Sequence, residues 1–77
     1  MTTPLSTMSD AVEHLRKGWP QMAHIELMTL LETLPMNSRY YLTVQKAASW
    51  IDNGLPQMAI EELERTLNME REYGTSI

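Results

Sequence analysis

The 77-residue sequence contains no cysteine, and its three glycines are isolated from one another. Without cysteine neither a disulfide framework nor a thiolate metal site can form, so cohesion has to come from apolar packing, within the chain or against a partner. No apolar run approaches the roughly 20 residues of a membrane span. The first six residues carry neither a positive charge nor an apolar stretch, so we expect no secretory signal. These absences predict a soluble cytoplasmic protein with no membrane partner.

Positive charge is scarce, because six basic residues stand against ten acidic ones and the formal net charge is −4. The basic residues are scattered along the chain and form no stripe: Arg16, Lys17, Arg39, Lys46, Arg65 and Arg71. A surface of net negative charge repels phosphate backbones at long range. We therefore expect no nucleic-acid partner, although a short glycine-containing turn between two helices is also used by DNA-binding proteins.

Patterns that support catalysis or metal binding are missing too. No glycine-rich loop is available to cradle a phosphate group. His14 and His24 are ten positions apart, with no cysteine and no second ligand at helical metal spacing. No serine or threonine has an activating neighbour at a recognisable spacing. The sequence therefore predicts no enzyme, no metal site and no cofactor.

The sequence does contain a six-residue segment that occurs twice with one difference. Residues 18–23 read Gly-Trp-Pro-Gln-Met-Ala, and residues 54–59 read Gly-Leu-Pro-Gln-Met-Ala, so five of the six are identical at an offset of 36. The same offset pairs further residues outside the segment: Ala11 with Ala47, Glu26 with Glu62, Leu27 with Leu63, and Leu31 with Leu67. Self-similarity at a fixed period predicts two copies of one supersecondary unit.

In the first unit, Thr7 and Asp10 are suited to cap a helix that runs to about residue 17. Gly18 provides the left-handed residue that ends a helix, and Pro20 suits the first position of the next one. This second helix extends over about residues 20–34 and ends before a proline. Residues 1–6 show no periodicity, and we expect them to form a disordered lead.

The second unit repeats this arrangement. Asn37 or Ser38 is suited to cap a helix over about residues 39–52, and the turn at Gly54 leads into a fourth helix over about 56–72. We expect residues 73–77 to form a flexible tail. The predicted organisation is a single all-α domain over 7–72, built from two tandem helix-turn-helix hairpins at 7–35 and 37–72.

Apolar residues spaced by three and four predict which side of each helix faces the core. The expected core residues are Met8, Ala11, Val12 and Leu15; Ala23, Leu27, Leu30, Leu31 and Leu34; Tyr40, Val44, Ala47, Ala48 and Ile51; and Ala59, Leu63, Leu67 and Met69. Met22 and Met28 flank the second set, and Ile60 lies beside the fourth.

On these residues the chain resembles the tetratricopeptide (TPR) family of helical-hairpin repeats. Residues of the family pattern stand at matching places: the small Ala11, Ala23, Ala47 and Ala59, the large Leu27 and Leu63, the aromatic Trp50, and the closing Pro35. Others depart from it: His14, Leu30, Thr66 and Arg71. The period is also two residues longer than the family's 34. A four-helix bundle that arose by duplication is the alternative architecture.

The TPR resemblance implies a concave groove built by the first helix of each unit. Its expected lining is Met8, Val12 and Leu15 with Tyr41, Val44, Gln45 and Ala48, and its rim would carry Arg39 or Lys46. Trp19, between a glycine and a proline, is either a hydrophobic plug of the turn or an anchor for a partner.

Two units are fewer than the three or so that usually stand alone, so we expect apolar surface to remain exposed and to be covered by self-association or by another protein. The predicted function is a small interaction module, an adaptor or chaperone that shields an apolar helical or extended segment. In size, charge and helix pattern the chain is similar to small TPR-like chaperones of type III secretion. The alternative function is a regulatory antagonist, such as an antiactivator or a phage-encoded inhibitor, that acts through a dimeric helical surface.

Overall fold

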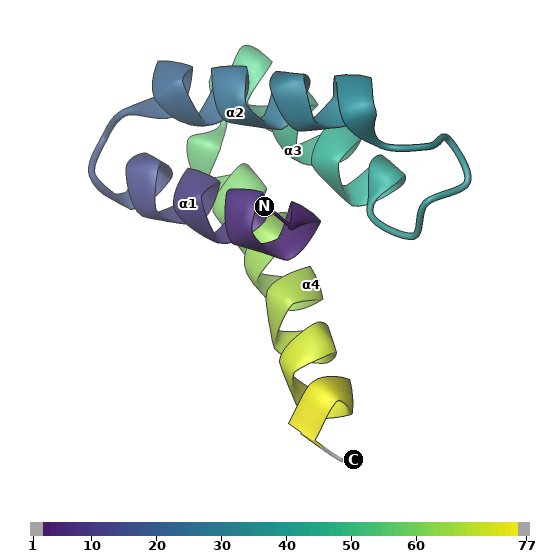
Figure 1. The fold of residues 1–77 in the computed structure, drawn as a ribbon. Helices are drawn as coiled ribbons and strands as arrows, with labels where there is room; N and C mark the ends of the chain where they lie inside the picture. The colour runs from purple at the N-terminus through teal and green to yellow at the C-terminus, as the bar shows by residue number, and fades with distance from the viewer. Residues whose placement is uncertain (1–2, 76–77) are drawn as a thin grey trace.

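The computed structural model describes residues 3–75, and the side chains of residues 3–70. It contains four α-helices in the order α1 (Pro4–Arg16), α2 (Pro20–Thr33), α3 (Tyr41–Asp52) and α4 (Pro56–Thr75), with no strand in the described range (Figure 1). The predicted all-α class with four helices is therefore confirmed. None of these helices combines the length and the apolar composition needed to cross a bilayer.

The two hairpins close on each other to form a ring of four helices. α1 packs against α2 and α4, and α3 packs against the same two helices. The diagonal pairs, α1 with α3 and α2 with α4, touch only slightly. The C-terminal turns of α4 extend past the other helices, which makes the molecule 38 Å long but only 23 and 21 Å in the other directions (Figure 1).

The core consists of apolar residues from all four helices: Met8, Ala11, Val12, Leu15, Ala23, Leu27, Leu30, Val44, Ala47, Ala48, Ala59, Ile60 and Leu63. Four of them are the alanines that the repeat places at equivalent positions, and each of these four is fully buried. Because the distance between packed helices depends on the side chains at the contact, small residues from every helix allow all four to approach closely. Among residues 3–70 no polar or charged residue is buried.

The turn between α1 and α2 is a Schellman motif. Gly18 has a φ of +83°, and its N–H donates to the carbonyl of Leu15 at 3.1 Å. The N–H of Trp19 donates to the carbonyl of His14 at 2.8 Å. These two bonds satisfy carbonyls that the helix end leaves without intrahelical partners. Pro20 then begins α2, because its fixed φ suits the first helical position.

The turn between α3 and α4 repeats this geometry. Gly54 has a φ of +77° and donates to Ile51 at 3.0 Å, while Leu55 donates to Trp50 at 2.8 Å. Pro56 begins α4. The duplication seen in the sequence therefore extends to the hydrogen bonds of the two turns. The two turns differ in the position of their tryptophan. In the first turn the tryptophan directly follows the glycine, whereas in the second it is Trp50, which lies in the helix before the glycine.

The first helix begins four residues earlier than predicted, at an N-cap of Thr3 instead of Thr7. Its N-cap is Thr3, whose Oγ1 accepts a hydrogen bond from the N–H of Ser6 at 3.1 Å, and Pro4 occupies the first helical turn. Thr7 is inside the helix and donates its N–H to the carbonyl of Thr3. The expectation of a disordered lead is therefore wrong for residues 4–6, because a threonine followed by proline is itself a helix start. Residues 1–2 lie outside the described residues.

The other boundaries differ by smaller amounts. α2 ends at Thr33, one residue before the predicted end, and α3 begins two residues later than predicted because a turn at Ser38 precedes it. α4 continues to Thr75, three residues past its predicted end at residue 72, and residues 76–77 of the expected tail lie outside the described residues. Met69, expected in the core, is 50 % exposed, so this expectation is wrong.

Candidate binding surface

The groove expected along the two first helices is absent. Met8 and Val44 are fully buried, and Val12, Leu15 and Ala48 are at most 7 % exposed. The physical reason is the closed ring, in which α1 and α3 lie diagonally and α2 and α4 cover their apolar sides. Side chains this deeply buried hold the bundle together, and a partner could contact them only if the fold opened. Their assignment as a partner-binding surface is therefore wrong, except for Ala48, which lies at the bottom of another groove.

That other groove lies between α2 and α3 and has a volume of about 680 Å³; we call it the α2/α3 groove. Its lining comes from both helices: His24, Met28, Leu31 and Glu32 from α2, and Tyr41, Gln45, Ala48, Ser49 and Asp52 from α3. Three predicted site residues, Tyr41, Gln45 and Ala48, are thus brought together. These three residues face α2. None of the residues of α1 that were predicted to line a groove lines the α2/α3 groove.

Hollows flank α2 along both of its sides. A smaller hollow of about 500 Å³ shares His24 and Asp52 with the α2/α3 groove and extends it toward Pro20. On the opposite side, a hollow of about 690 Å³ separates α2 from α1, and we call it the α1/α2 groove. Ile25 lines both the smaller hollow and the α1/α2 groove. α2 therefore stands out as a ridge between two depressions.

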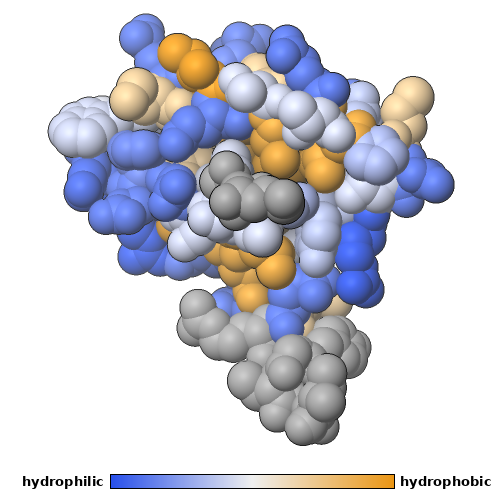
Figure 2. All heavy atoms as spheres, viewed as in Figure 1, coloured by the Kyte–Doolittle hydropathy of each residue, from blue (hydrophilic) through white to orange (hydrophobic). Residues whose placement is uncertain are grey.

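The crest of this ridge is apolar. Met22, Ile25 and Met28 are 51 %, 61 % and 44 % exposed, and they are spaced by three along the helix. We call these three residues the α2 ridge. Figure 2 shows an orange and a tan group at the upper left of the molecule, over the first part of α2, with blue polar groups along most of the rest of this edge. Large apolar side chains that lie together on a surface mark interaction sites more often than scattered ones do.

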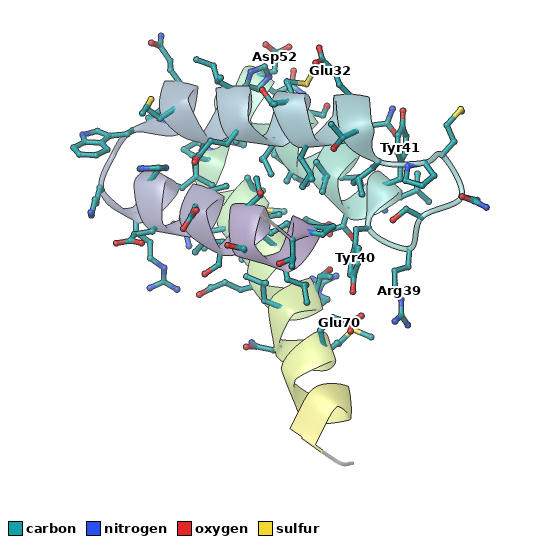
Figure 3. All side chains as sticks on the ribbon, in the orientation of Figure 1. Glu32, Arg39, Tyr40, Tyr41, Asp52 and Glu70 are labelled. Atoms are coloured by element: carbon teal, nitrogen blue, oxygen red, sulfur yellow. The ribbon has the colours of Figure 1, made fainter. Side chains whose placement is uncertain are left out.

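The charges around the α2 ridge have one sign. Glu32 and Asp52 line the α2/α3 groove, and Asp10 and Glu26 line the α1/α2 groove. Of the side chains that the structure describes, no lysine or arginine lines either groove or the smaller hollow. Figure 3 shows Glu32 and Asp52 at the upper edge of the molecule, on the α2 side. The candidate surface is therefore apolar along its crest and acidic along its flanks.

The predicted rim residues have other positions. Arg39 forms an ion pair with Glu70, with 3.2 Å between Nη1 and Oε1, and this pair connects the segment before α3 to α4 (Figure 3). Tyr40 faces the same carboxylate. Partial burial and the nearby negative charge of Glu70 raise the pKa of the Tyr40 hydroxyl above its ordinary value of 10.0. Lys46 is exposed on α3 but does not line the α2/α3 groove.

Trp19 is 52 % exposed at the turn before α2. Its ring stacks on His14, with centroids 5.8 Å apart, and Lys17 Nζ lies 5.6 Å from the ring centroid. His14 Nδ1 is in turn 2.6 Å from Glu26 Oε1 on α2. The stacked pair is the contact between C″ and C3 that accompanies a Schellman motif, so one face of the indole stabilises the turn. The rest of the ring remains open to solvent.

The sequence analysis missed Ile25, His24, Glu32 and Asp52 as surface-forming residues. A signal for Ile25 was present, because positions 22, 25 and 28 fall opposite the buried positions 23, 27 and 30 on a helical wheel. No pattern in one helix could reveal the groove, since it is made by two helices whose pairing depends on the closed ring.

Comparison with known proteins found no family model, no curated protein and no solved structure that matches this chain. Among the described residues, no group of three or more histidine, aspartate and glutamate side chains is placed to hold a metal ion. The function is therefore argued from the α2 ridge and the grooves beside it.

Proposed function

We propose that this protein is a small interaction module, an adaptor or chaperone, that covers an apolar helical segment of another protein with the α2 ridge and the α2/α3 groove. The observation that supports the proposal most directly is the exposure of Met22, Ile25 and Met28 on one face of one helix, beside a hollow. Transfer of apolar surface out of water is favourable by roughly 25 cal/mol per Å², and part of this gain offsets the entropic cost of association.

An amphipathic helix suits this surface because it can lay its apolar side chains into a groove between two other helices. Met28, Leu31 and Ala48 supply the apolar part of the groove. Methionines on the ridge favour such binding, since an unbranched thioether side chain adapts to different partner shapes.

A second copy of the chain fits this surface less well. In a two-fold dimer the same patch lies on both subunits, so the Glu32 and Asp52 side chains of one copy would approach the same acidic patch of the other. Like charges brought together in an interface oppose association. We therefore assign the surface to a different protein, and sedimentation of the free protein tests this choice. A dimer that Ile25→Asp separates into monomers would contradict it.

The binding test uses a displayed library of amphipathic helices whose apolar positions vary among Leu, Ile, Met and Phe. Selected helices are then measured against the wild-type protein, Ile25→Asp and Leu42→Asp by fluorescence anisotropy. Leu42 is a matched control because it is also a large exposed apolar residue, 64 % exposed against 61 % for Ile25, but on α3 and outside the α2/α3 groove.

Ile25→Asp should lower the affinity at least about tenfold, since it places a charge where an apolar contact forms, whereas Leu42→Asp should leave it within about twofold. Selection of no helix above background, or equal binding by Ile25→Asp and wild type, would overturn the proposal.

A further inference from the structure

We infer that the helix bound by this surface is cationic, with lysine or arginine residues along the edges of its apolar face. The inference rests on the proposed function and specifies the chemistry of the partner. The observation behind it is the charge around the α2 ridge, which is negative on both of its sides.

Carboxylates occupy both sides of the ridge, and they come from three helices. Asp10 lies on the α1 side, and Glu32 of α2 and Asp52 of α3 lie on the other side. Among the side chains of residues 3–70, no lysine or arginine lines either groove or the smaller hollow, and none occurs in the sequence of α2. A partner helix that covers the ridge therefore meets negative charge along both of its edges.

These carboxylates are also free to receive a cation. Among the side chains that the structure describes, Asp10, Glu32 and Asp52 take part in no ion pair. Elsewhere on the molecule three basic residues already have acidic partners: Arg16 pairs with Glu64, Lys17 with Glu13, and Arg39 with Glu70. Among the described side chains five acids take part in no ion pair: Asp10, Glu32 and Asp52 line the grooves beside the ridge, where a partner would dock, and Glu61 and Glu62 lie on α4.

The chemistry of long basic side chains suits this arrangement. Lysine and arginine can lay their aliphatic stems along apolar surface, here the methionines of the ridge, and still place the charged group beside a carboxylate at the edge. Complementary charge of this kind selects partners and accelerates association more than it adds affinity. It also disfavours an acidic helix, because like charges would face each other across the interface.

The test uses the same helix library, with the positions at the edges of the apolar face varied equally among Lys, Gln and Glu. Selection on the wild-type protein should enrich lysine and deplete glutamate at these positions. Glu32→Gln/Asp52→Asn should then lower the affinity of an enriched helix by about five- to tenfold, as expected for the loss of two exposed charge pairs.

Glu61→Gln/Glu62→Gln is the matched control, since it removes the same net charge from α4, outside the α2/α3 groove, and should change the affinity less than twofold. In 1 M salt, where screening acts over about 3 Å, the difference between the groove variant and wild type should largely disappear.

The outcomes separate this inference from the proposed function. If neutral or acidic edges are enriched as strongly as lysine, and Ile25→Asp still abolishes binding, the cationic partner is wrong and the interaction module stands. Equal effects of the groove variant and the control variant would also overturn the inference. If no helix is enriched, or Ile25→Asp has no effect, the proposed function fails and the inference fails with it.

Discussion

Replacing Gly18 and Gly54 by alanine tests whether the two turns are physically equivalent. Both glycines have positive φ, +83° and +77°, and an added Cβ would have no atom within 4 Å at either site. Any loss of stability therefore comes from the backbone conformation and not from a collision. Holding an L-residue in the left-handed region costs roughly 1–2 kcal/mol, and the lower entropy of the unfolded alanine chain returns about 0.4–1 kcal/mol.

The expected net loss is about 1 kcal/mol of unfolding free energy for each single variant. It should be about 2 kcal/mol for the double variant, because the two turns lie in separate hairpins and such effects add. In a domain of this size, 1 kcal/mol corresponds to a fall in Tm of about 4–8 °C. Urea unfolding followed by far-UV circular dichroism measures the loss directly. Gly18→Asn is the control and should lose less, since asparagine tolerates the left-handed region better than alanine.

A loss at one glycine without a comparable loss at the other would refute the equivalence of the turns. A loss above about 3 kcal/mol at either site would show that the added methyl group collides with something. If neither variant lost stability, the positive φ values themselves would be contradicted.

Three further predictions concern the core and the contact between α3 and α4. Leu27→Ala should cost about 2–5 kcal/mol in urea unfolding because Leu27 is fully buried, whereas Met36→Ala, at 83 % exposure, should stay within about 0.5 kcal/mol. The Trp50 indole N–H is buried with no hydrogen-bond partner among the described residues, so in the same assay Trp50→Phe should change stability by no more than about 1 kcal/mol. The raised pKa of Tyr40 favours the folded state fully below pH 10 and less as pH rises through the folded-state pKa. Unfolding free energies measured from pH 8 to 12 should therefore show wild type losing stability relative to Tyr40→Phe only above about pH 10, and a constant difference across the range would contradict this.

The core could be predicted from the sequence because it depends on periodicity within single helices. Leu27 and Val44, for example, lie on strongly apolar helix faces, and both are fully buried. The turns could be predicted for a similar reason, since a glycine followed two residues later by a proline ends one helix and starts the next within a few residues. Local chemistry is also sufficient for the start of α1, since Thr3 followed by Pro4 is as good a helix start as the capping pattern at Thr7.

The candidate site could not be predicted in the same way, because it depends on how the hairpins pair. In the arrangement implied by the TPR resemblance the two first helices would expose Val12 and Val44 together. In the closed ring the same residues point into the centre and are buried. Tyr41 and Gln45 then face α2 across a groove that no single helix reveals. The pairing depends on side-chain packing among all four helices, which periodicity within one helix does not encode.

Methyl NMR of the protein with a selected helix tests the central claim that the outer face of α2 is the binding surface. The methyl groups of Met22, Ile25 and Met28 report on the α2 ridge, and those of Val12 and Val44 report on the core between the first helices. On addition of the helix, the three ridge methyls should shift strongly and the two valines should hardly move. Large shifts at Val12 and Val44 with an unchanged ridge would show that the partner binds between the first helices and would contradict the claim.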